Sequence, residues 1–262
     1  MGHERVNVVP KTERWKAILE KLESLYTSDI PVSEIAEQTL RNVRNRYSTL
    51  AQDPSVQGAF AFLVALSNAC GSSDARKVLE TAGIKVPENP TPLSVVKALK
   101  DHLPSHIANT EYGQLAVSAA ADAIVQWYRD NSSKQESLFK ASPQFFENCR
   151  ALAEGKGFCE ISRVFFGKLT ERYLNYFLDR AGSSAFRSLE ERQRFQADLR
   201  QYADSVSQHA FETAKITQSF SAGWFNKNAR ERIPGSKEIR GFLSHAFGKM
   251  KEELRIEEEA KR

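Results

Sequence analysis

EISRVFFGKLTERYLNYFLDR, residues 160–180, carries the clearest structural signal of this chain. Apolar side chains recur there every three or four positions, at Ile161, Phe165, Leu169, Tyr173, Tyr176 and Phe177. Polar side chains form the opposite stripe, at Lys168, Arg172, Asn175 and Asp179. This period matches the 3.6 residues per turn of an α-helix. The segment therefore predicts a helix with one buried face.

A second long helix is expected directly after the first. Ser188-Leu-Glu-Glu191 has the form of a capping box. A seam of apolar positions close to a heptad pattern follows it, at Phe195, Leu199, Tyr202, Val206, Ala210, Thr213, Ile216 and Phe220. An unbroken helix from Ser188 to Phe220 would be about 50 Å long. We expect it to stop near Gly223 and a last helix to begin at Ser236, after a turn at Pro234-Gly235.

Shorter helices are predicted before residue 155. Asp53-Pro54, Thr91-Pro92 and Ser142-Pro143 each place an N-cap oxygen before a proline, which suits the first position of a helix. These three signals predict helices over 54–70, 92–103 and 143–154. Apolar periodicity and glycine positions predict four more over 11–26, 33–47, 74–82 and 110–130, with an irregular connection over 84–92.

Together these patterns predict an all-α fold, a multi-helix bundle with short N-terminal helices and longer C-terminal helices. The only strand candidate is the short run from Val6 to Val9. Polar residues cluster between 131 and 142, which leaves two interpretations of the domain organisation open. One is an N-terminal helical region (1–131) followed by a C-terminal long-helix region (142–262), and the other is one continuous domain.

The composition is that of a globular protein that carries a modest positive charge. The 262 residues are 41% hydrophobic and 27% charged, with a formal net charge of +4, which permits an acidic partner without requiring one. Cys70, Cys149 and Cys159 have no CxxC spacing, which indicates reduced thiols. The most apolar stretch, residues 58–70, is too short to span a bilayer, and the N-terminus lacks the apolar segment of a signal peptide. We expect a cytoplasmic protein without a membrane anchor.

No motif indicates a metal, nucleotide or nucleophile site. His102 and His106 have the i, i+4 spacing of two metal ligands, but Pro104 is expected to break the helix between them. The glycine pair Gly155 and Gly157 lacks the GK[ST] sequence of a phosphate-binding loop and suggests a helix terminus. Cys159 has no identifiable base beside it. We therefore expect no metal, no cofactor and no dedicated catalytic site.

The segment from Gly223 to Lys251 is basic and aromatic. Its cations are Lys227, Arg230, Arg232, Lys237, Arg240, Lys249 and Lys251, opposed by Glu231 and Glu238, and its aromatic residues are Trp224, Phe225, Phe242 and Phe247. Cations beside stackable rings are typical of sequence-tolerant DNA or RNA binding. The alternative is that the rings pack inward and the cations form a solvated face.

One enzyme hypothesis comes from a motif. Arg240-Gly-Phe-Leu-Ser-His245 resembles the RxxxxH motif of the HEPN ribonucleases, which are all-α and metal-independent. In that family the pair lies at a dimer groove and acts on the scissile phosphate, so the resemblance implies Arg240 and His245 as catalytic residues. The spacing is expected to put both on nearly one helical face. Gly241 departs from the polar residue that is common at that position.

A second resemblance concerns biological context. The segments His3 to Pro10 and Lys11 to Trp15, with the aromatic helix from Phe165 to Arg180, are similar to helical proteins encoded in bacterial defence islands. The resemblance implies a subunit of a multi-protein anti-phage system, without an activity or site residues. The apolar seam from Ser188 to Phe220 could bind another protein subunit or a second copy. We therefore predict a non-enzymatic assembly or adaptor subunit that contacts nucleic acid through its basic C-terminal region, with the HEPN-like ribonuclease as the alternative.

Overall fold

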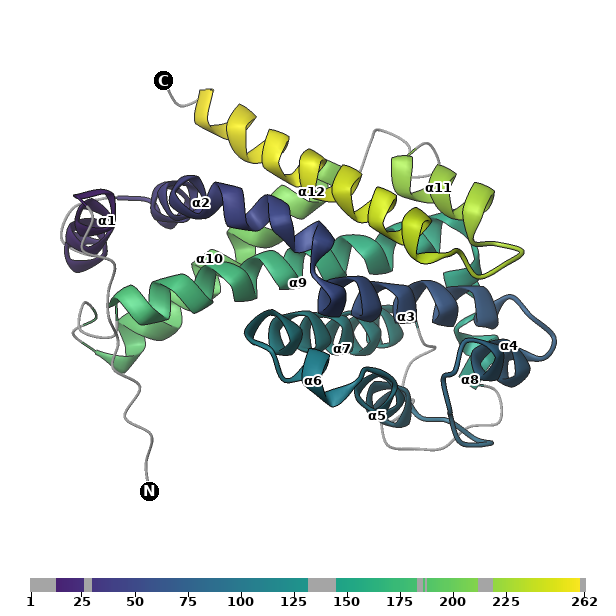
Figure 1. Cartoon of the computed structure of the whole chain (residues 1–262). Helices are drawn as coiled ribbons and strands as arrows, with labels where there is room; N and C mark the ends of the chain where they lie inside the picture. The colour runs from purple at the N-terminus through teal and green to yellow at the C-terminus, as the bar shows by residue number, and fades with distance from the viewer. Residues whose placement is uncertain are drawn as a thin grey trace.

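The computed structural model describes residues 13–25, 30–131, 145–182, 186, 188–211 and 219–259. Within these residues the chain is helical and contains no β-strand (Figure 1), which confirms the all-α prediction. The first part comprises α1 (Glu13–Ser24), α2 (Val32–Thr49), η1 (Leu50–Gln52), α3 (Pro54–Cys70), α4 (Ala75–Thr81), α5 (Pro92–His102), α6 (Ser105–Ala108) and α7 (Glu111–Asn131). The second comprises α8 (Phe145–Asn148), η2 (Arg150–Ala153), α9 (Gly155–Gly182), α10 (Leu189–Phe211), α11 (Phe220–Asn228) and α12 (Ser236–Glu259).

The central element is α9, the longest helix in the described residues. α7 and α10 pack along it, α11 packs against its first turns, and α12 runs along one edge of the molecule across α2, α3 and α10 (Figure 1). α9 is buried on more than the single face that its sequence predicts, since Val164, Ser162 and Thr170 are buried together with the expected apolar positions other than the partly buried Tyr176. It also begins at Gly155 rather than at Glu160.

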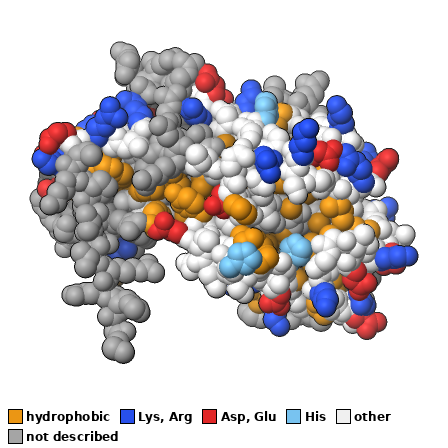
Figure 2. All heavy atoms as spheres, viewed as in Figure 1, with side chains coloured by type: hydrophobic (Ala, Val, Ile, Leu, Met, Phe, Trp, Pro, Cys, Tyr) orange, Lys and Arg blue, Asp and Glu red, His pale blue; other side chains and the backbone are white. Residues whose placement is uncertain are grey.

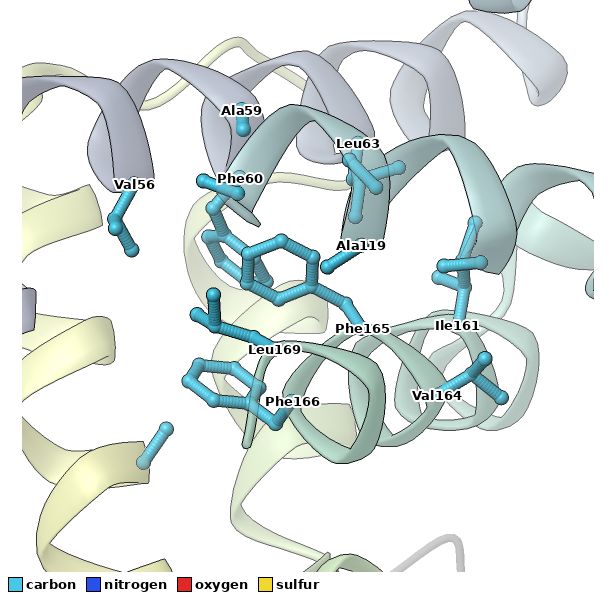
Figure 3. Close-up of a cluster of buried hydrophobic side chains, with 14 of the residues drawn as sticks. Val56, Ala59, Phe60, Leu63, Ala119, Ile161, Val164, Phe165, Phe166 and Leu169 are labelled. Atoms are coloured by element: carbon cyan, nitrogen blue, oxygen red, sulfur yellow. The ribbon is translucent and has the colours of Figure 1, made fainter. Parts of the chain in front are cut away.

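The core joins helices from both ends of the chain. The ring of Phe60 in α3 lies 5.6 Å from Phe165 and 5.7 Å from Phe166 in α9, and it stacks on Phe242 of α12 at 4.9 Å between centroids. Figure 3 shows Phe60 among the apolar side chains of α3 and α9, with Ala119 of α7 beside them. The regions before residue 131 and after residue 145 therefore share one apolar core.

Two of the three proline-capped helices form as predicted. α3 and α5 begin at Pro54 and Pro92, where the Asp53 carboxylate accepts from the backbone N–H of Ser55 at 2.9 Å and Thr91 forms a capping box with Ser94. The third prediction is wrong in part, because the segment 143–154 is not one helix. α8 ends at Asn148 and the chain tightens into the 3₁₀ helix η2, while the Ser142-Pro143 signal lies outside the described residues.

The single helix predicted from Ser188 to Phe220 is also wrong. α10 ends at Phe211 within the described residues, and Ser219 has an extended backbone (φ −64°, ψ 150°) that caps α11. Phe220 therefore starts a different helix, and Gly223, expected at a helix end, lies inside it. The seam positions Phe195, Leu199, Tyr202, Val206 and Ala210 are buried within the chain, whereas Thr213 and Ile216 lie outside the described residues.

The remaining elements follow the sequence closely. α12 begins at Ser236 directly after Pro234-Gly235, and Gly83 ends the α4 region with a backbone φ of +75°. The strand candidate Val6 to Val9 and the polar segment 132–142 lie outside the described residues. No helix in the described part of the chain is long and apolar enough to cross a membrane.

Candidate nucleic-acid interface

The aromatic residues of α11 and α12 point into the core. Phe225, Phe242 and Phe247 are buried, and the ring of Phe225 stacks on Phe158 of α9 at 4.5 Å. Trp224 is partly buried, with its ring 4.7 Å from Phe242 and 5.9 Å from Phe158. The aromatic rings of this segment therefore pack inward, as the alternative interpretation predicts, and binding of nucleic acid by its cations stays a prediction.

Cations occupy the opposite, outer side of the same two helices. Figure 2 shows Lys and Arg side chains gathered over α11 and α12. We call the exposed set the basic surface, and it consists of Lys227, Arg230, Lys237, Arg240 and Lys249. None of the five forms an ion pair with another described residue. Lys251, which the sequence also suggested, is partly buried.

Arg232 has a different role from the other cations. Its guanidinium forms a two-pronged ion pair with Glu238, with Nη1 at 2.9 Å from Oε2, and the same oxygen accepts from the backbone N–H of Gly235 at 2.9 Å. The hydrogen bonds from Arg232 and Gly235 lower the pKa of Glu238 to about 2. The charge of Arg232 is therefore neutralised by Glu238, and the pair holds the loop between α11 and α12. The sequence had grouped Arg232 with the phosphate-binding cations.

Asn68 of α3 holds the end of α11 in place. Its Nδ2 donates to the backbone carbonyl oxygens of Ala229 and Arg230, at 2.6 and 2.9 Å. This contact anchors the backbone from which the Arg230 side chain extends. Asn68 was not among the residues predicted from the sequence, although the apolar stretch 58–70 carries a signal for it. An amide within so apolar a helix is expected to be buried, and a buried amide needs hydrogen-bond partners.

Arg240 and His245 both lie on the exposed side of α12. Five residues turn an α-helix by about 140° beyond one full turn, so the two side chains do not share one face as expected. The His245 ring instead makes an edge contact with Phe220 of α11, 4.8 Å away. Their proposed role as a catalytic pair stays a prediction.

The helix that carries His102 does not continue to His106. α5 ends at His102 and α6 begins at Ser105, which confirms that the helix breaks at Pro104. Among the described residues no group of three or more His, Cys, Asp and Glu side chains could hold a metal ion. Cys159 is buried, with its Sγ 3.1 Å from the Ser219 hydroxyl.

A polar groove of about 760 Å³ lies between α7, α9 and α10. The buried Glu171 carboxylate accepts from Lys168 at 3.4 Å and from Arg200 at 3.1 Å, and Arg172 pairs with Asp122 at 2.5 Å. Because these cations each face a carboxylate, the groove links three helices by ion pairs. It differs in this respect from the basic surface, whose five cations form no ion pair with another described residue.

Comparison of the chain with models of known protein families, with curated proteins and with solved structures finds no match.

Proposed function

We propose that this protein is a non-enzymatic helical subunit that contacts nucleic acid through the basic surface on α11 and α12. The observation that carries the proposal is the two-sided nature of this segment: its aromatic rings pack inward, and five exposed cations on its outer side form no ion pair with any described residue. Each cation that neutralises a phosphate releases condensed counterions, which favours binding irrespective of sequence.

The extent of the basic surface suits a polyphosphate backbone. Lys237 and Lys249 are separated by about 18 Å along the axis of α12 at 1.5 Å per residue. Duplex DNA carries one charge per about 1.7 Å of its axis, so a surface of this length spans several phosphates. Lys227 and Arg230 add charge from the α11 side. Asn68 and the Arg232–Glu238 pair fix the connection between the two helices, which reduces the ordering that binding requires.

We also propose that the protein assembles with other proteins, but not through the apolar seam of α10. The described seam residues are already buried against other helices of the same chain. The resemblance to proteins of bacterial anti-phage systems and the cytoplasmic location likewise stay predictions. A pull-down from the native host would identify partner subunits, and recovery of the chain alone would argue against an assembly role.

Two matched triple variants test the nucleic-acid proposal. Lys227→Ala, Arg230→Ala and Arg240→Ala remove three charges from the basic surface, and Lys85→Ala, Lys97→Ala and Lys100→Ala remove three exposed charges from α5 and the connection before it. Both variants lower the formal net charge of +4 equally. We expect affinity for a fluorescent oligonucleotide to fall roughly tenfold or more in the first variant only. Equal losses would show that net charge, not this surface, determines binding.

The ribonuclease alternative is tested with the same protein. RNA is incubated with wild type and with His245→Ala in the presence of a chelator, because the HEPN-like mechanism needs no metal. Our proposal predicts intact RNA with both proteins. Cleavage by wild type that is lost in His245→Ala would replace the non-enzymatic proposal.

A further inference from the structure

We infer that the basic surface binds duplex DNA rather than a single strand, with the exposed face of α12 set into the major groove. The inference rests on the proposed function and narrows its substrate class. It starts from the burial of the aromatic rings. Proteins that bind single strands stack bases on exposed rings, which strengthens binding by about fivefold or more per base.

Three phenylalanine rings of α11 and α12 are not available to bases. Phe225, Phe242 and Phe247 are 0%, 2% and 3% exposed. The partly buried Trp224 contacts two phenylalanine rings, and the exposed His245 contacts Phe220. Bases of a duplex are already stacked on one another and need no such platform. The described part of α11 and α12 therefore offers cations to phosphates but no exposed phenylalanine, tyrosine or tryptophan ring on which unpaired bases could stack.

The cations flank the exposed face of α12. Its buried residues are Ile239, Phe242, Leu243, Ala246, Phe247 and Met250. At about 100° per residue, Arg240 and Lys249 fall about 180° apart, at the two borders between the buried and exposed sides. Each can therefore reach a phosphate on a different side of the helix. An α-helix with its side chains is about 10–12 Å across, close to the roughly 12 Å width of the B-DNA major groove.

A ridge of three small residues, Gly241, Ser244 and Gly248, runs along the exposed face between these flanks, and a Cβ added at either glycine would meet no atom within 4 Å. The exposed His245 and Glu252 lie on the Lys249 side of this ridge. Along the ridge itself the face therefore presents no bulky side chain to hold the phosphate backbones away. It also carries few groups that read base edges, so we expect little sequence preference. Duplex RNA has a deep, narrow major groove that does not admit a helix in this way.

Competition between three nucleic acids tests the inference. A labelled 30-base-pair DNA duplex is displaced by unlabelled duplex DNA, by one of its single strands, or by duplex RNA of equal length. Duplex RNA is the control for charge density. We expect duplex DNA to compete at least tenfold better than either of the others. If the single strand or the RNA competes equally well, the inference is wrong while the proposed function stands, and if nothing binds, both are wrong.

A bulky residue on the exposed face gives a second test. Ser244→Trp should weaken duplex DNA binding fivefold or more without a change in the helical circular dichroism spectrum. Ser73→Trp, at an exposed site after α3, is the matched control and should leave affinity unchanged. If Ser244→Trp binds the single strand more tightly and the duplex no less tightly, α12 does not enter the groove.

Discussion

Asn68 shows how one buried amide supports the basic surface. It links α3 to the backbone after α11 by two hydrogen bonds, to Ala229 and Arg230. Asn68→Ala would leave the buried carbonyl of Ala229 and the partly buried carbonyl of Arg230 without this donor, which we expect to cost about 1–3 kcal/mol of unfolding free energy. Urea unfolding measures the loss, and Asn89→Ala, an exposed amide in the connection before α5, should change it by less than about 0.5 kcal/mol. A loss no larger than that of the control would mean that the contact does not hold α11.

Two buried groups that lose a proton only at alkaline pH, the Cys70 thiol and the Tyr47 hydroxyl, are expected to make the folded state less stable as pH rises. Burial raises the pKa of the Cys70 thiol, with Cys149 as a neighbour, and burial also raises the pKa of the Tyr47 hydroxyl, which bonds Thr170 at 2.9 Å. Both groups stay neutral in the folded state and ionise in the unfolded state. Their contribution is therefore fully present below the unfolded thiol pKa of about 8.5 and declines as pH rises above it.

Urea unfolding at pH 7.5 and 9.5 measures this dependence. We expect lower stability at pH 9.5, and a smaller difference in Cys70→Ala, because that variant has one group fewer to ionise. An unchanged difference in Cys70→Ala would assign the alkaline loss to other groups.

At the scale of single elements, two helical glycines differ in the space around them. A Cβ on Gly157 would lie 2.0 Å from the backbone oxygen of Ala151, and backbone atoms there cannot move aside cheaply, whereas a Cβ on Gly248 meets nothing within 4 Å. We expect Gly157→Ala to destabilise the protein despite the higher helix propensity of alanine. Gly248→Ala should stabilise it by about 0.5–1 kcal/mol. Thermal unfolding compares the two, and shifts of equal sign would contradict this account of α9.

Helix starts could be predicted well where a cap lies beside a proline, as at Asp53 and Thr91, because that signal is local. The break in the helix before α11 could not be predicted from the sequence. Phe220 continues the apolar spacing of α10, and a spacing pattern does not record the direction of the chain. The glycine pair Gly155 and Gly157 did suggest a helix terminus, and α9 begins at Gly155. The close approach of Gly157 to the backbone of Ala151 is not recorded by apolar periodicity.

On the scale of the whole molecule, the shared core predicts one cooperative unfolding transition. Phe60, Phe166 and Phe242 join helices from both regions that the sequence left as one or two domains. Circular dichroism and tryptophan fluorescence should therefore give coincident urea curves, since Trp15, Trp127 and Trp224 report from α1, α7 and α11. Two separated midpoints would favour two domains instead.

The cations of the basic surface could be found from sequence, because a charge run is visible without a fold. The inward direction of Phe225 and Phe242 could not, since it depends on the contacts of these rings with Phe158 and Phe60. The same holds for Arg232, whose charge is balanced only because the turn at Gly235 brings Glu238 within reach.

The salt dependence of DNA binding tests the central claim most directly. If the five cations of the basic surface contact phosphates, the logarithm of the association constant falls linearly with the logarithm of salt concentration, with a slope of about −3 to −4.5. Removing Arg240 alone should reduce that slope by about 1. Binding that is insensitive to salt between 50 and 200 mM, or a slope unchanged in Arg240→Ala, would contradict the claim that these cations bind phosphates.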